Sequence, residues 1–185
     1  MGMPAQETEW TAEKARALPD DGKRYEVLDG ELFVSPAPSW DHQSVVERLH
    51  LLLAPYVEAH GLGWAKLSPA DIEFSPRRLL QPDLFVVPAA ARRPRDWRDV
   101  KTLLLAVEVL SPGTARADRL RKRVIYQQQR VPEYWIVDPD GRVVERWRPD
   151  DERPEILAEV LRWQPRDGAV PLEIDLAALF EKALD

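Results

Sequence analysis

A single carboxylate interrupts the most apolar stretch of the chain. Glu108 follows the run Leu103-Leu104-Leu105-Ala106-Val107 and precedes Val109-Leu110. Such a run is typical of a strand that is buried on both faces of a sheet, where every neighbour of the glutamate is apolar. An unpaired carboxylate is costly to bury. We therefore expect Glu108 to be protonated, paired with a basic group or bound to a cation.

A second carboxylate opens another apolar run. Asp83 stands 25 positions earlier (108 − 83) and precedes Leu84-Phe85-Val86-Val87. If the two strands are neighbours, their carboxylates meet at one place in the sheet. Lys122 follows on a predicted helix and would bring an ammonium group to the same place. Two acids and a lysine at a sheet edge indicate a site for a divalent cation and a phosphate, because Mg²⁺ prefers hard oxygen ligands.

Helical spacing supports this placement of the lysine. The predicted helix begins after Thr114, a plausible N-cap, and runs to about Gln129. A polar stripe at helical spacing is expected to face the site, and an apolar stripe is expected to hold the helix on the sheet. The polar stripe is Asp118, Lys122, Tyr126 and Gln129, and the apolar stripe is Leu120 and Val124.

The remaining segments predict one mixed α/β domain that spans residues 1–185, with a loose leader at 1–9 and a core at about 23–165. Asp29-Gly30 is typical of a tight hairpin turn, and Pro55 should bend or shorten the first long helix. The expected helices are 11–18, 41–60 and 176–184; the expected strands are 25–28, 31–34, 64–66, 70–74, 134–137, 143–147 and 156–163.

Composition limits the cellular setting. The chain of 185 residues contains no cysteine, which excludes disulfides and thiolate metal sites and favours a reducing cytoplasm. No apolar run approaches the ~18 residues of a membrane span, and the N-terminus lacks the order of a signal peptide. We expect a cytoplasmic protein without a membrane partner.

The net charge of −6 argues against tight, non-specific binding to nucleic acid, although a local basic cleft could still attract it. Two groups of arginines could follow a phosphate backbone, and a solvated charged face explains them equally well. These groups are the 92–98 loop and Arg116, Arg119, Arg121 and Arg123.

Several of these segments together resemble the PD-(D/E)XK nuclease superfamily. They are QPD at 81–83, EVLSP at 108–112, a helix with a lysine four residues before a tyrosine, and PEYWIVD at 132–138. With YEVLDGELFVSPAP and HQSVVERL, the chain is similar to the large bacterial family of restriction endonuclease-like proteins over roughly 25–147. The resemblance implies a restriction-endonuclease-like core, in which helices flank a mixed β-sheet behind an N-terminal β-hairpin. It also implies magnesium dependence and DNA as the substrate.

Individual residues of this chain match motif positions of the family. Asp83 matches the motif aspartate, and Glu108 matches the acidic residue of the (D/E)XK element. Leu110 stands where the element has its lysine and cannot replace it, whereas Lys122 matches a lysine that the bacterial family carries on the next helix. His42 matches a histidine common in the family, although it could simply cap its helix. Arg130 replaces a glycine of the family, a departure that concerns a turn.

These observations lead to one leading hypothesis and two alternatives. The leading hypothesis is a DNA endonuclease that uses Mg²⁺, or Mn²⁺ in its place. In it, Asp83 and Glu108 are metal ligands and Lys122 is the catalytic base or stabilises charge. The first alternative is a catalytically inactive module that keeps the nuclease fold and binds DNA or protein. The second is a dimeric scaffold, since the aromatic hairpin at 134–147 makes a homodimer reasonable.

Overall fold

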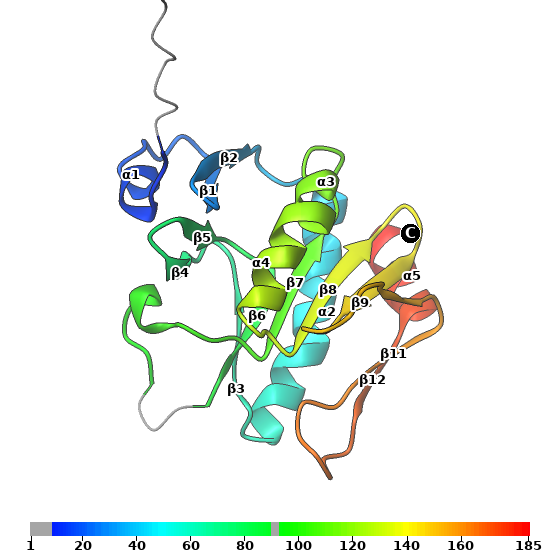
Figure 1. Cartoon of the computed structure of the whole chain (residues 1–185). Coiled ribbons are helices and arrows are strands. Elements are labelled where there is room, and N and C mark those ends of the chain that lie inside the picture. Colours follow the sequence, from blue (N-terminus) through cyan, green and yellow to red (C-terminus); the bar gives the residue numbers. More distant parts are fainter. Residues whose placement is uncertain (1–8, 90–92) are drawn as a thin grey trace, which may run out of the picture.

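A six-stranded mixed sheet lies at the centre of the structure (Figure 1), a computed structural model that describes residues 9–89 and 93–185. The expected leader falls almost entirely outside the described residues, as does Arg92 of the arginine-rich loop. Strands β7 and β8 are parallel, and the other neighbouring pairs are antiparallel. The order across the sheet is β10 (Glu155–Leu157), β9 (Val143–Trp147), β8 (Glu133–Asp138), β7 (Leu105–Val109), β6 (Leu84–Pro88) and β3 (Gly63–Leu67).

Helices cover both faces of this sheet (Figure 1). On one face, α2 (Trp40–Ala59) and α5 (Leu176–Leu184) pack on the main apolar core. On the other, a continuous helical segment consists of α3 (Ala115–Ala117), a π-helical turn (Asp118–Lys122) and α4 (Arg123–Gln128). The predicted fold class, a mixed sheet flanked by helices, is confirmed. No helix among residues 9–89 and 93–185 is both long and apolar enough to cross a membrane.

A smaller sheet contains the predicted N-terminal hairpin. Its order is β2 (Glu31–Ser35), β1 (Arg24–Leu28), β5 (Arg78–Leu80) and β4 (Ile72–Ser75). The backbone is left-handed at Asp29 (φ 53°) and Gly30 (φ 88°), as a tight hairpin turn requires. Helix α1 (Ala12–Arg16), capped by the Thr11 hydroxyl, packs on this sheet. Strand β1 is the element that brings Arg24 and Glu26 toward the large sheet.

The early end expected at Pro55 and the single strand expected at 156–163 are wrong. Helix α2 continues through Pro55 to Ala59, close to the expected bounds 41–60, because Pro55 lies on the exposed face, where water can satisfy the carbonyl that it leaves unpaired. The alternative expectation, a bend at Pro55, stays a prediction. The single strand expected at 156–163 is two strands. The chain bends after β10, which pairs with β9, and β11 (Val160–Trp163) then pairs with β12 (Leu172–Asp175).

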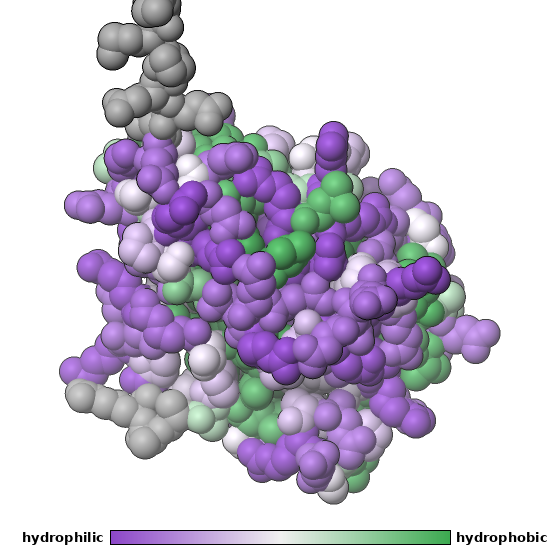
Figure 2. Space-filling view, in the orientation of Figure 1, coloured by the Kyte–Doolittle hydropathy of each residue, from purple (hydrophilic) through white to green (hydrophobic). Residues whose placement is uncertain are grey.

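Of the two stripes expected on the third helical segment, the polar stripe faces the site as predicted, and the apolar stripe does not hold the helix on the sheet. Leu120 is 56% exposed and Val124 is only partly buried, so neither holds the helix on the sheet. The buried side chains are instead Asp118, Lys122 and Tyr126 of the polar stripe, together with Ala117 and Ile125. Figure 2 shows a mostly hydrophilic face with apolar side chains exposed over this helix. The helix packs on the sheet through Ala117, Ile125 and Tyr126, and Lys122 pairs with buried acids on β1 and β7.

Candidate active site

Strand register brings the two predicted acids together. Strands β6 and β7 pair with Leu84 opposite Val107, so one further step places Asp83 opposite Glu108. The Oδ2 atom of Asp83 accepts a hydrogen bond of 2.9 Å from the backbone N–H of Val109, which confirms that the strands are neighbours at this point. Side chains directly opposite each other on neighbouring strands have Cβ atoms about 4.5–5.5 Å apart. Both carboxylates are buried.

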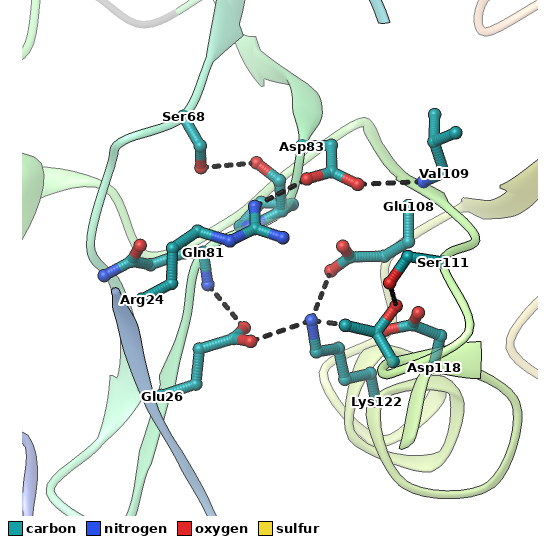
Figure 3. A network of polar contacts seen from close by, with 12 residues as sticks. Arg24, Glu26, Ser68, Gln81, Asp83, Glu108, Val109, Ser111, Asp118 and Lys122 are labelled. Atoms are coloured by element: carbon teal, nitrogen blue, oxygen red, sulfur yellow. Dashed lines mark hydrogen bonds and ion pairs between the residues drawn. The ribbon is translucent and has the colours of Figure 1, made fainter. Parts of the chain in front are cut away.

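Lys122 stands at the centre of a cluster of acids (Figure 3). Its Nζ atom lies 2.9 Å from Glu26 Oε2, 3.2 Å from Glu108 Oε1 and 3.2 Å from Asp118 Oδ1. The Tyr126 hydroxyl donates a hydrogen bond of 3.2 Å to the same Oε1 atom of Glu108. All of these side chains are almost completely buried. The structure thus places Lys122 beside Glu108, as the helical spacing predicted.

Asp83 has different partners. Arg24 Nη1 lies 2.5 Å from Asp83 Oδ1, and His42 Nε2 lies 3.1 Å from Oδ2. Figure 3 shows the Arg24 guanidinium reaching from β1 toward Asp83. A guanidinium and an imidazole therefore already contact the carboxylate that the sequence predicted as a metal ligand.

Burial and neighbouring charges shift the pKa values of this network in opposite directions. Burial raises the pKa of Glu108 well above its usual value, the Lys122 ammonium opposes that shift, and the Asp83 charge adds to it. Burial also raises the pKa of Asp118. Burial by itself would raise the pKa of Asp83 as well, but the hydrogen bond to His42 and the charge of Arg24 hold it below its usual value. Asp83 is thus the acid most firmly held as a carboxylate.

Lys122 is firmly held as an ammonium. Burial by itself would lower its pKa, but the charges of Glu108, Glu26 and Asp118 raise it well above the usual value of a lysine. This shift favours the protonated amine, which agrees with the charge-stabilising role. Both roles predicted for Lys122, catalytic base and charge stabiliser, stay predictions.

The network has more acids than bases. Among the described residues, four buried or nearly buried carboxylates face two basic side chains, which leaves two negative charges if all the acids ionise. The acids are Glu26, Asp83, Glu108 and Asp118, and the bases are Arg24 and Lys122. The Oδ1 atom of Asp118 has the Lys122 ammonium at 3.2 Å, and among the described residues the buried Oδ2 atom has no hydrogen-bond partner. Such an excess must be removed by protons or balanced by a further cation.

The donor chemistry fits Mg²⁺, but the acids are not arranged as a complete set of metal ligands. Carboxylate oxygens are the ligands that Mg²⁺ prefers, and both hydrogen bonds to Glu108 go to Oε1 and not to Oε2. However, no three His, Cys, Asp or Glu side chains within residues 9–89 and 93–185 are grouped so that they could hold a metal ion. Arg24 and Lys122 each already pair with one of the two predicted metal ligands.

Two pockets border the network on its Asp83 and His42 side. A pocket of about 430 Å³ is lined by Arg24, Ser68, Gln81 and Asp83 among others. Another, of about 630 Å³, lies where β7 and β8 end and is lined by residues that include His42. Neither of these two pockets is lined by Glu108 or Lys122.

Comparison with known proteins identifies the family. The sequence profile of the Uma2 family, described as "Putative restriction endonuclease", matches residues 12–177. The chain belongs to the Uma2 family. This confirms the restriction endonuclease-like family that the motifs predicted, and it supports a nuclease-like function.

A solved structure has the same fold as this Uma2 chain. It is a "putative nuclease belonging to DUF820" from Anabaena variabilis, with a TM-score of 0.74 and 20% sequence identity. The match covers 94% of this chain and 99% of the other. No curated protein matches the sequence.

Two residues of the candidate site, Arg24 and Glu26, were not predicted from the sequence, and for His42 the sequence left two roles open. Arg24 carried no signal, since an arginine at the start of a strand is usually exposed. Glu26 did carry one: like Glu108, it precedes apolar residues in a strand, and it is fully buried. His42 matches a histidine common in the family, with a helix cap as the alternative; the Ser39 hydroxyl caps α2, and the His42 ring contacts Asp83.

Most of the arginines around Lys122 are engaged within the chain. Arg119 pairs with Asp138 and Glu145, Arg121 pairs with Glu31, and the Arg123 guanidinium lies 4.7 Å from the centre of the Trp147 ring system. Arg116 is exposed. A role for this group in binding a phosphate backbone stays a prediction.

Proposed function

We propose that this Uma2 chain is a magnesium-dependent endonuclease that hydrolyses phosphodiester bonds in DNA. Asp83 and Glu108 would be the metal ligands, and Mn²⁺ could take the place of Mg²⁺. The observation that carries the proposal is the meeting of these two carboxylates on neighbouring strands beside the Lys122 ammonium. The excess of buried negative charge supports it, because a divalent cation would balance two such charges.

The residues of the chain have distinct tasks in this proposal. A bound magnesium ion supplies Lewis-acid stabilisation of the phosphate and an activated water. Lys122, held as an ammonium, stabilises negative charge that grows on the phosphate oxygens. Arg24 and His42 keep Asp83 ionised and oriented. The Tyr126 hydroxyl fixes the Glu108 carboxylate through Oε1, which leaves Oε2 for a ligand.

Cleavage of supercoiled plasmid DNA tests the proposal. Wild-type protein should nick the plasmid in Mg²⁺, should fail in EDTA, and should lose activity in the Glu108→Ala variant. Glu31→Ala is the matched control, because its side chain is 73% exposed and touches none of the four buried acids. Equal nicking by wild type and Glu108→Ala would contradict the assignment.

A specific observation favours the inactive module as second candidate. Both predicted metal ligands already pair with a cation, Asp83 with Arg24 and Glu108 with Lys122. In a nuclease fold that no longer binds a metal, such ion pairs could neutralise the buried acids and stabilise the structure. In that case a gel-shift assay at low salt should detect DNA binding that Glu108→Gln leaves unchanged, and metal should produce no cleavage.

The homodimer stays a prediction without a defined surface. The aromatic residues of the hairpin that suggested it, Tyr134, Trp135 and Trp147, are buried within the chain. If a dimer forms, it must use other residues, and light scattering on the intact protein would establish the mass in solution.

A further inference from the structure

A pocket of about 430 Å³ opens beside the edge strand β3, away from the candidate active site. Its walls come from β3 and from the segment that leads into β7. Trp64 of β3 pairs with Val87, four positions along β6 from Asp83 (87 − 83). At about 3.3 Å per strand residue, this end of β6 lies roughly 13 Å from the acids.

Two tryptophans line this pocket, Trp64 and Trp97. Trp97 opens a short 3₁₀ helix in which the side chains of Asp96 and Asp99 form a reciprocal capping box. Its ring packs edge-on against Phe85, with ring centres 5.9 Å apart, yet the residue is still 37% exposed. The indole is therefore fixed in place while part of it remains open to a ligand.

Three basic side chains line the same pocket: Lys66, Arg93 and Arg95. Within the part of the chain that the structure describes, none of them forms an ion pair; many other arginines do. The acid in the lining, Asp96, pairs with the Arg98 guanidinium at 3.3 Å and accepts a hydrogen bond from the Arg98 backbone N–H. In a chain of net charge −6, this pocket therefore carries a local excess of positive charge.

We propose that this pocket binds an unpaired nucleotide, with the base against the exposed indole of Trp97 and the phosphate near Arg93 and Arg95. Every base has a π-face that stacks on an aromatic side chain, and arginine pairs well with phosphate. A base inside a duplex is already stacked on both sides and cannot use the indole. The ligand can be a free nucleotide or an unpaired nucleotide within a strand. The proposal goes beyond cleavage, because binding here requires no metal and no hydrolysis.

Fluorescence anisotropy in EDTA tests the proposal, with the intact protein and a fluorescein-labelled single-stranded oligodeoxynucleotide. Removing one base-stacking contact typically costs about 1–3 kcal/mol, so Trp97→Ala should weaken binding about 5- to 150-fold. Trp97→Phe should restore much of the loss. Arg93→Ala with Arg95→Ala should weaken binding and reduce its salt dependence. The same oligonucleotide paired with its complement should bind more weakly than the single strand.

Control variants and competitors make the outcome decisive. Trp40→Ala removes a tryptophan that is 84% exposed on another element, and Arg153→Ala removes an exposed arginine; both should leave the affinity unchanged. If deoxyadenosine monophosphate displaces the labelled oligonucleotide, the pocket accepts a free nucleotide. If only the unlabelled single strand displaces it, the pocket accepts a nucleotide within a strand. An affinity unaffected by Trp97→Ala, or full competition by tripolyphosphate, would overturn the proposal. Because the assay detects no cleavage, failure of the nuclease proposal would leave it intact.

Discussion

Asp83 is the residue that connects Arg24 and His42 to strand β7. Its Oδ1 atom holds the Arg24 guanidinium, while its Oδ2 atom holds both His42 and the backbone of β7. Burial pushes its pKa up, and these partners pull it below its usual value. The folded state therefore favours the ionised carboxylate more strongly than the unfolded state does.

This preference predicts a pH-dependent effect of Asp83→Asn. Because the pKa of Asp83 is depressed in the folded state, the unfolded chain binds more protons than the folded chain as the pH falls. The stability that Asp83 contributes is therefore fully present above the unfolded pKa of about 3.9, and it is lost as the pH falls toward the folded pKa. The variant should be less stable than wild type by about 3–5 kcal/mol near neutral pH, because Arg24 loses its counter-ion. Urea denaturation should find that difference constant above about pH 5 and shrinking below about pH 4.

A difference between the two proteins that grows as the pH falls would contradict this assignment. Asp41→Asn is a suitable control, because Asp41 is exposed in the first turn of α2 and contacts none of the buried acids.

At the residue scale, sequence predicted the acids better than their partners. Glu108 and Asp83 could be recognised because a carboxylate within or before an apolar run is itself an anomaly. Lys122 followed from helical spacing. Arg24 and His42 could not be placed, because a contact between β1, α2 and β6 depends on how two sheets and a helix pack, and no local pattern records that.

The helical segment Ala115–Gln128 turns its polar stripe to the site as expected, but its apolar contacts differ from the expected ones. An apolar stripe was expected to face the sheet, yet Leu120 faces solvent and the buried face carries Asp118 and Lys122. The π-helical turn over Asp118–Lys122 lies within this buried polar part. Such turns are frequent at functional sites, which agrees with the placement of Lys122.

This orientation predicts opposite results for two apolar truncations. Ile125→Ala should destabilise the protein by about 2–5 kcal/mol, because Ile125 is completely buried. Leu120→Ala should change the free energy of unfolding by less than about 0.5 kcal/mol, because the leucine is mostly exposed. Chemical denaturation at neutral pH measures both. A larger loss from Leu120→Ala than from Ile125→Ala would restore the sequence-based orientation.

Elements with a strong local signal were predicted well. The helix Leu176–Leu184 has the predicted bounds, and the Asp29-Gly30 hairpin forms because both positions adopt the left-handed backbone that its turn demands. The division of 156–163 was missed, because partner choice for short edge strands is decided by tertiary packing.

At the scale of the whole molecule, the network joins parts that are distant in sequence. Glu26 and Arg24 come from the small sheet, Asp83 and Glu108 from the large sheet, and Lys122 from the helix over its face. A cation that bound these acids would therefore hold several elements together and stabilise the whole fold.

Thermal unfolding with Mn²⁺ measures this coupling. At a metal concentration of about 100 times Kd, binding to the folded state alone adds about 2.7 kcal/mol, which corresponds to a rise in Tm of roughly 5–11 °C for a chain of this size. Glu108→Gln should abolish the rise, and Glu31→Ala should retain it. An equal rise in both variants would indicate that the metal binds elsewhere.

The pairing of β6 with β7 has a consequence for anyone who redesigns this protein. Side chains alternate across a strand, so a slip of β6 by one residue against β7 would place Asp83 on the face where Leu84 and Val86 now bury their side chains. A redesign of this sheet must therefore keep the β6–β7 register, because a one-residue slip separates Asp83 from Glu108.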